Sequence, residues 1–270
     1  MSTSARRPKL PPPEPGGPLP RTDVLGVAVN ALTYDLALDE IERRVAVRDR
    51  GYVTITGVHG VVESQRSPEL LRIHNEAALV CPDGMPMVWS SRYAGYGWAE
   101  RVYGPDLMLA ACERSARTGW RHFFYGGGEG VADLLRERLV TRFPGLQVVG
   151  THTPPFRPLV DDERAEVARL IDDARPDIVW VGLSTPKQER WMAEFRPHVE
   201  APVLVGVGAA FDFHAGLLDQ APPRIQQMGL EWAYRLVKEP RRLWRRYLTN
   251  NPAFVAAIVR RPPSAIDIEA

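Results

Sequence analysis

Asp83 is the residue of this chain best placed to act as a catalytic base. It stands in Cys81-Pro82-Asp83-Gly84, where an apolar run ends and a glycine permits a tight turn. A carboxylate at the end of a buried strand is a common position for a group that accepts a proton from a substrate. The same pattern also suits a turn-forming or helix-capping aspartate, so the residue alone leaves both interpretations open.

Polar or glycine-rich turns follow three other apolar runs. Gly126 and Gly127 open a turn that ends at residue 130, and bare backbone amides at a helix start can bind phosphate. Lys187 and Gln188 follow Thr185-Pro186 and predict a polar first helical turn, and Asp212 follows the small residues 206–210. Each segment is a candidate substrate contact. Each is equally compatible with an ordinary strand–helix turn, a solvated helix start or a packed core turn.

The C-terminal region concentrates positive charge in a chain whose net charge is only +1. Between residues 235 and 261, eight side chains are Lys or Arg and only Glu239 is acidic. Aromatic side chains, among them Trp232, Trp244 and Tyr247, are interleaved with these bases. This composition suits a diphosphate, an anionic membrane surface, or both. A solvated helix face and core packing of the rings remain alternatives, and the absence of a binding motif disfavours nucleic acid.

Several classes of protein are disfavoured. The six His and two Cys residues show no metal-ligand spacing, and no Gly-x-Ser-x-Gly motif of a serine hydrolase occurs, so we expect no metal and no cofactor. No apolar run of about 18 residues and no signal-peptide core is present. We therefore expect a cytoplasmic protein whose membrane contact is peripheral.

The elements that must position these residues alternate between short apolar runs and amphipathic segments. Strands are predicted at 52–56, 78–81, 122–125, 147–150, 177–181 and 202–207, and helices at 37–47, 61–75, 85–92, 106–118, 130–142, 161–174, 186–196 and 223–236. This alternation predicts an α/β fold, a Rossmann-like, mainly parallel sheet flanked by helices. Residues 1–21 are Pro-rich and are expected to be disordered, residues 22–220 to form the α/β body, and residues 221–270 a helical basic appendage. Pro240 is expected to break the helix before it.

Taken together, the motifs resemble those of the WecG/TagA/CpsF family of bacterial glycosyltransferases. The resemblance covers about residues 23–250 and rests on segments that occur in the family's order. They are Pro82-Asp83-Gly84, Arg101-Val-Tyr-Gly-Pro-Asp106-Leu, Thr153-Pro-Pro-Phe-Arg157, Pro186-Lys-Gln-Glu-x-Trp191, Gly206-Val-Gly-Ala-Ala-Phe-Asp212 and Gly229-Leu-Glu-Trp-x-Tyr-Arg235-Leu.

The resemblance implies transfer of a sugar from a nucleotide diphosphate-sugar to a polyprenyl-diphosphate-linked acceptor, with inversion and without a required metal. It implies Asp83 as general base and Thr54 as a second active-site residue, and it places Gln188, Arg101 and Asp106 near the substrates. It also implies that the appendage binds the membrane and helps to complete the site. The candidates to meet a diphosphate are the arginines Arg235, Arg241, Arg242 and Arg245.

The specific sugar and the oligomeric state, including a homo-oligomer, stay open. The chain departs from the family pattern at Thr56, at Met85-Pro86 and at residues 220–224, so N-acetylmannosamine, its uronate and another hexose are all candidate donor sugars. Two other functions also fit parts of the sequence. A nucleotide-sugar-modifying enzyme would use the Gly126 turn for NAD, and a non-catalytic scaffold of a polysaccharide assembly complex would keep the fold without turnover.

Overall fold

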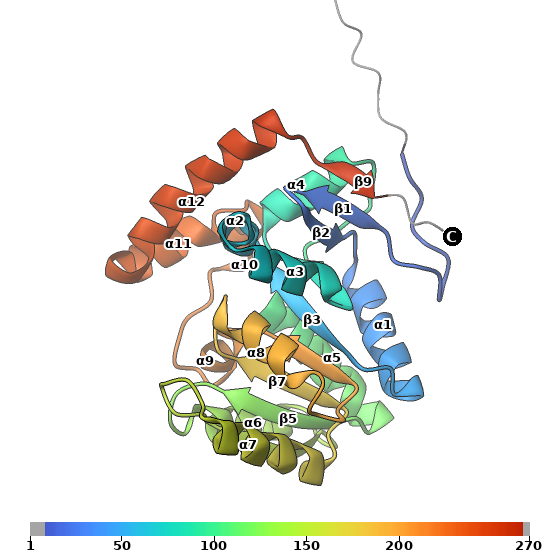
Figure 1. Cartoon of the computed structure of the whole chain (residues 1–270), viewed down its shortest axis with the longest axis vertical. Helices are drawn as coiled ribbons and strands as arrows, with labels where there is room; N and C mark the ends of the chain where they lie inside the picture. Colours follow the sequence, from blue (N-terminus) through green and yellow to red (C-terminus); the bar gives the residue numbers. More distant parts are fainter. Residues whose placement is uncertain (1–8, 267–270) are drawn as a thin grey trace, which may run out of the picture.

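The computed structural model of the chain describes residues 9–266, except the side chains of Pro223, Gln227, Arg242 and Arg246. Its centre is a six-stranded parallel sheet with the strand order β4-β3-β8-β7-β5-β6 (Figure 1). The strands are β3 (Gly51–Thr56), β4 (Leu79–Pro82), β5 (Arg121–Gly126), β6 (Gln147–His152), β7 (Ile178–Gly182) and β8 (Val203–Gly206). All six lie where the apolar runs predict them, so the predicted α/β fold with a parallel sheet is confirmed.

Helices cover both faces of this sheet because alternate strand residues point to opposite sides. Phe124, Trp180 and Val205 face one core, and their neighbours Phe123 and Val179 face the other. The first core is closed by α1 (Tyr34–Val47), α5 (Gly104–Thr118), α6 (Val131–Arg142) and α9 (Ala210–His214). The second is closed by α2 (Val58–Arg66), α3 (Pro68–Glu76), α7 (Asp161–Ala174) and α8 (Lys187–Phe195).

A small antiparallel sheet, which the sequence pattern did not predict, joins the two ends of the described chain. β1 (Arg21–Val24) and β2 (Val27–Asn30) form a hairpin whose two-residue turn has positive φ at Leu25 (55°) and Gly26 (89°). β9 (Ser264–Ile266) pairs with the other edge of β1, and α4 (Met85–Tyr93) packs against this sheet. Residues 9–20 contain no helix or strand, yet the Leu10 amide donates to the Gly95 carbonyl at 3.0 Å. The expected disorder of the leader stays a prediction for residues 1–8, which lie outside the described part.

Three helices form the C-terminal region: α10 (Pro223–Gln227), α11 (Glu231–Lys238) and α12 (Pro240–Arg260). The predicted break at Pro240 is confirmed, and the single helix predicted at 223–236 is instead two, with Gly229 between them at φ 71°. Figure 1 shows α11 and α12 on the side of the molecule where α2 lies, away from α6 and α7. α12 packs on α2 through buried side chains such as Phe254. The division of the chain at residue 221 into body and appendage stays a prediction.

Candidate active site

A cavity of about 400 Å³ lies between the carboxyl ends of β3 and β4 and the three C-terminal helices. Its body side consists of residues 57–60 after β3, residues 83–86 after β4, Trp89 on α4 and Arg101. Its other side consists of residues 228–232 and Arg235 together with α12 residues such as Asn250 and Phe254. The carboxyl edge of a parallel sheet is where such folds bind their ligands. The cavity is therefore the candidate active site.

Asp83 is held at the edge of this cavity by backbone contacts between two neighbouring loops. Its amide donates to the Thr56 carbonyl at 2.9 Å, which extends the β3–β4 pairing by one residue. A Cβ atom on Gly57 would lie only 2.9 Å from the Asp83 carbonyl oxygen, so a glycine is needed for this close approach. The Asp83 side chain is 34% exposed. Its carboxylate is therefore fixed in place and open to a ligand in the cavity.

Arg101 links Asp83 to the C-terminal helices. Its Nε and Nη2 atoms lie 3.4 and 3.3 Å from Oδ1 of Asp83. Its Nη1 donates to Oε1 of Gln226 at 3.1 Å, and its Nη2 also donates to Oε2 of Glu231. The guanidinium lies 4.0 Å from the centre of the Tyr103 ring. One side chain from the body thus contacts the base candidate and two residues of the appendage.

Electrostatics in this cluster follow from burial and from the two carboxylates. Burial alone would lower the pKa of the Arg101 guanidinium, but the negative charges of Asp83 and Glu231 outweigh burial and raise it. Burial and the nearby Asp83 carboxylate raise the pKa of Glu231, against the opposing effect of Arg101. Burial and Glu231 also raise the pKa of the Tyr103 hydroxyl. Arg101 therefore stays charged, whereas Glu231 binds a proton more readily than an exposed glutamate.

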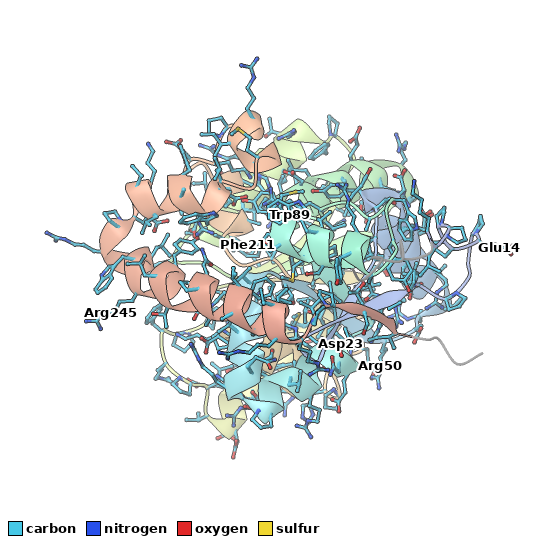
Figure 2. The ribbon with its side chains drawn as sticks, turned by 90° about the horizontal axis from the view of Figure 1, so that it is seen from above. Glu14, Asp23, Arg50, Trp89, Phe211 and Arg245 are labelled. Carbon is cyan, nitrogen blue, oxygen red and sulfur yellow. The ribbon has the colours of Figure 1, made fainter. Side chains whose placement is uncertain are left out.

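Of the four predicted diphosphate-binding arginines, the structure brings Arg235 to the cavity. Its guanidinium lies 4.0 Å from the Glu239 carboxylate. Arg241 and Arg245 are exposed on α12, and Figure 2 shows Arg245 at the outer edge of the molecule. The side chain of Arg242 lies outside the described part of the structure.

Asp106 lies in the first turn of α5 and interacts electrostatically with Arg101. The Tyr34 hydroxyl donates to Oδ2 of Asp106 at 3.5 Å and accepts from the Tyr103 amide at 2.9 Å. His214 lies on the other side, with Nε2 at 2.9 Å from the Pro105 carbonyl oxygen. Burial raises the pKa of Asp106, although the positive charge of Arg101 opposes the effect. Asp106 is therefore a neighbour of the cluster and does not line the cavity.

A second group of predicted residues gathers at the carboxyl ends of β5, β7 and β8. Gly126 has φ 119°, and a Cβ there would lie 2.7 Å from the Gly182 carbonyl oxygen. The Gly127 amide donates to that same oxygen at 3.0 Å. Asp212 lies in α9, whose Phe211 ring packs on Gly182. The predicted Gly126, Gly127 and Asp212 therefore share one region of the sheet edge.

Gln188 and Lys187 begin α8 beside this region and differ in orientation. Gln188 is 3% exposed; its Nε2 donates to Oε1 of Glu189 at 3.2 Å, and its Oε1 has no hydrogen-bond partner among the described residues. That oxygen lies 3.5 Å from the Cβ position of Gly208. The exposed Lys187 ammonium lies 4.9 Å from the ring centre of Phe156. Thr185, just before the helix, lines the same cavity as Asp83, and its hydroxyl donates to Oε1 of Glu189 at 2.8 Å.

The structure does not bring Thr54 to the cavity. Thr54 is fully buried, and its hydroxyl lies 3.2 Å from Nδ1 of His74 on α3. The period-two alternation of a strand explains this position, because Ile55, which lines the cavity, points to the opposite face from Thr54. As placed here, Thr54 supports the packing of α3 on β3.

Residues of the site that the sequence analysis missed include His59, Gln226, Glu231 and Asn250. Nδ1 of His59 lies 2.9 Å from Nδ2 of the buried Asn250, and both residues line the cavity. Glu231 stands in the segment Gly229-Leu-Glu-Trp, just before a tail that is strongly basic. This isolated acid beside an aromatic residue was the one available signal.

The described part of the chain also bears on metals and membranes. Within residues 9–266, no group of three or more His, Cys, Asp or Glu side chains is arranged to hold a metal ion. Over the same residues, no helix combines the length and apolar character needed to cross a bilayer.

Comparison with known proteins gives a family match over nearly the whole described chain. The model of the glycosyl transferase WecG/TagA/CpsF family matches residues 22–265. The chain is similar to an N-acetylglucosaminyldiphosphoundecaprenol N-acetyl-beta-D-mannosaminyltransferase of Bacillus spizizenii, 33% identical over 198 residues that cover 73% of this chain and 74% of the relative. It is also similar to a protein of the same description from Staphylococcus aureus, 24% identical over 242 residues that cover 89% of this chain and 92% of the relative.

Proposed function

The chain belongs to the WecG/TagA/CpsF family of glycosyltransferases, and from this membership we propose that it moves a sugar from a nucleotide diphosphate-sugar to a polyprenyl-diphosphate-linked saccharide. The descriptions of its relatives name an N-acetylmannosaminyl group as the sugar and N-acetylglucosaminyldiphosphoundecaprenol as the acceptor. The donor of this chain is UDP-N-acetylmannosamine, the corresponding uronate, or another activated hexose. The product belongs to the synthesis of a cell-surface polysaccharide or teichoic acid.

The observation that carries this proposal is the Asp83 carboxylate at the edge of a cavity that also contains Arg235. In the reaction, the acceptor hydroxyl oxygen attacks the anomeric carbon of the donor, and its proton passes to Asp83. The bond between the anomeric carbon and the diphosphate oxygen breaks, and the nucleoside diphosphate leaves with the bonding electron pair. One displacement with one base inverts the anomeric configuration, and no covalent nucleophile is needed.

Arginines supply positive charge for the diphosphate groups, so the proposed reaction needs no metal ion. Arg235 lines the cavity, where its planar guanidinium can bind two oxygens of the departing diphosphate. Arg241 and Arg245, on the exposed surface of α12, are placed to meet phosphates of the acceptor or of lipid headgroups. Arg242 belongs to the same proposal by its position in the sequence.

The donor nucleotide-sugar is proposed to extend from Asp83 toward the second polar group. Gly126 and Gly127 offer a turn that approaches Gly182 closely. The buried Oε1 of Gln188 has no hydrogen-bond partner among the described residues, so it can accept a hydrogen bond from a sugar hydroxyl or from an N–H group of the nucleotide base. Lys187 precedes Gln188 at the start of α8, and Asp212 follows Phe211, whose ring packs on Gly182.

We place the protein at the inner surface of the cytoplasmic membrane, held there by its C-terminal helices. Trp244 is 46% and Leu248 64% exposed on α12, and exposed arginines lie beside them. Aromatic and apolar side chains interleaved with bases suit the interface of an anionic bilayer. The cavity lies between these helices and the body, so an acceptor anchored in the membrane would reach Asp83 from that side.

The test is to incubate the purified protein with a panel of UDP- and GDP-sugars and a polyprenyl-diphosphate-N-acetylglucosamine analogue, and to measure the release of nucleoside diphosphate. Release that requires the acceptor and one donor supports the proposal. Donor binding without turnover would indicate that the acceptor bears a different or longer glycan. Neither donor binding nor turnover would favour the scaffold, and a dependence on NAD would favour the nucleotide-sugar-modifying enzyme.

A further inference from the structure

Arg101 is shared between two carboxylates that come from different parts of the chain. Its Nη2 lies 3.3 Å from Oδ1 of Asp83 and also contacts Oε2 of Glu231 at the start of α11. The two carboxylate oxygens contact one nitrogen, so they are no more than about 6 Å apart. Arg101 and Glu231 are only 14% and 16% exposed, so water screens the cluster weakly.

The sharing of Arg101 affects how readily Asp83 can accept a proton. An arginine paired with one carboxylate stabilises the carboxylate's charge and makes it a poorer proton acceptor. A second ionised carboxylate on the same guanidinium opposes that effect, and with both carboxylates ionised the three groups together carry one net negative charge. The proton from an acceptor hydroxyl then enters a cluster that is already rich in negative charge, and Arg101 keeps Glu231 as a partner once Asp83 is neutral.

We propose that Glu231 is a positioning residue for the transfer, because it holds and neutralises Arg101 from the appendage and so leaves Asp83 free to accept a proton. The base is then fully competent only while α11 is docked on the body. The inference rests on the proposed function, since it assigns a role in the reaction that Asp83 would perform.

Other groups face the cluster as well and are part of the expected pH dependence. Tyr34 on α1, Cys81 on β4 and Asp106 on α5 interact electrostatically with Asp83. The Tyr103 hydroxyl interacts electrostatically with Glu231. His59 on α2 and Arg235 on α11 line the same cavity. Glu231 differs from these in contacting the same Arg101 nitrogen as Asp83.

The first test is Glu231→Gln, which keeps an oxygen acceptor for Arg101 and removes the charge. We expect the acidic limb of the kcat–pH profile to move to lower pH by about one to two units, because one unit charge within about 6 Å has been lost. We expect kcat on its plateau to fall about 3- to 10-fold, since a weaker base transfers the proton less readily, while KM for the donor changes less than about twofold.

A charge relocation separates this role from packing. Gln226 contacts Nη1 of Arg101 at 3.1 Å, so Gln226→Glu combined with Glu231→Gln moves the negative charge to the other side of the same guanidinium. We expect this double variant to return the acidic limb toward the wild-type position, with Gln226→Glu alone as the control. If Glu231→Gln does not fold, the comparison of the double variant with Gln226→Glu carries the test, because these two proteins differ only in the charge of residue 231. We then expect the acidic limb of the double variant to lie at lower pH than that of Gln226→Glu, and coincident limbs would overturn the inference.

A measurement without turnover distinguishes failure of this inference from failure of the proposed function. Carbon-13 NMR titration of aspartate carboxyls, with Asp83→Asn to assign the Asp83 signal, gives the pKa of Asp83 in wild type and in Glu231→Gln. We expect a lower pKa in the variant whether or not any donor is accepted. The inference is overturned if the Asp83 titration and the acidic limb are both unchanged by Glu231→Gln, or if the double variant restores neither.

Discussion

Replacing Asp83 by Asn tests the assignment of the base with little disturbance to the structure. Asn has the size of Asp, keeps an oxygen for Arg101 and keeps the backbone bond to Thr56. The lost ion pair is one-third exposed on the Asp83 side, and Arg101 retains Glu231, so we expect a stability loss of at most about 1 kcal/mol. In a chain of this size that corresponds to a fall of about 2–4 °C in Tm.

Turnover should respond far more strongly than stability. Loss of a general base typically costs about 100- to 10,000-fold in rate, which is the fall in kcat expected for Asp83→Asn. Donor affinity, measured by calorimetry, should stay within about threefold of the wild type. The matched control is Asp49→Asn, since Asp49 pairs with Arg43 at 3.1 Å but precedes β3, at the opposite edge of the sheet. If Asp83→Asn kept more than a tenth of wild-type kcat, Asp83 would not be the base.

Four further outcomes follow from the same structure. Arg235→Gln should lower kcat/KM about 10- to 100-fold in steady-state assays, because a charge-assisted contact to diphosphate is lost; Arg260→Gln, at the exposed end of α12, is the control, and equal losses would contradict the role of Arg235. Trp244→Ala should weaken flotation with anionic vesicles several-fold, whereas Phe156→Ala, an exposed ring on the loop before α7, should not. Excess EDTA should leave the initial rate within about twofold, and a loss that added Mg²⁺ restores would refute the arginine account. Burial lowers the pKa of His74 to about 4, so its contribution to stability is complete above the unfolded pKa near 6.5 and falls as the pH drops from 6.5 to 4. Urea unfolding should show that the free energy of unfolding falls by up to about 3 kcal/mol between pH 6.5 and 4 because of this group. His74→Gln should remove this part of the pH dependence, and a variant with the same pH dependence as the wild type would contradict the assignment.

The sheet and the position of Asp83 could be predicted from the sequence because they depend on local patterns. Short runs of buried residues, such as those of β3 and β7, are typical of strands in a sheet that is covered on both faces. Polar turns follow the carboxyl ends of these strands. The helices predicted at 61–75 and 223–236 are each divided into two in the structure, and both divisions have local causes. Ser67-Pro68 ends α2, and Gly229 separates α10 from α11.

What the sequence could not predict depends on contacts between distant segments. Arg101 and Glu231 are 130 residues apart and meet only because the C-terminal helices dock over the end of β4. β9 has three residues and no apolar run of its own, so its pairing with β1 has no sequence signal. The alternation within β3 shows that Thr54 and Ile55 face opposite sides. It cannot show that α3 covers the side of Thr54.

The most direct test of the central claim is the anomeric configuration of the product. Proton NMR of the glycolipid formed by acceptor-dependent turnover gives this configuration and can be compared with that of the donor. Attack by the acceptor hydroxyl, with Asp83 as the single base, predicts an inverted linkage and one nucleoside diphosphate released for each sugar transferred. A retained configuration, or nucleoside diphosphate released at the same rate without acceptor, would contradict the account.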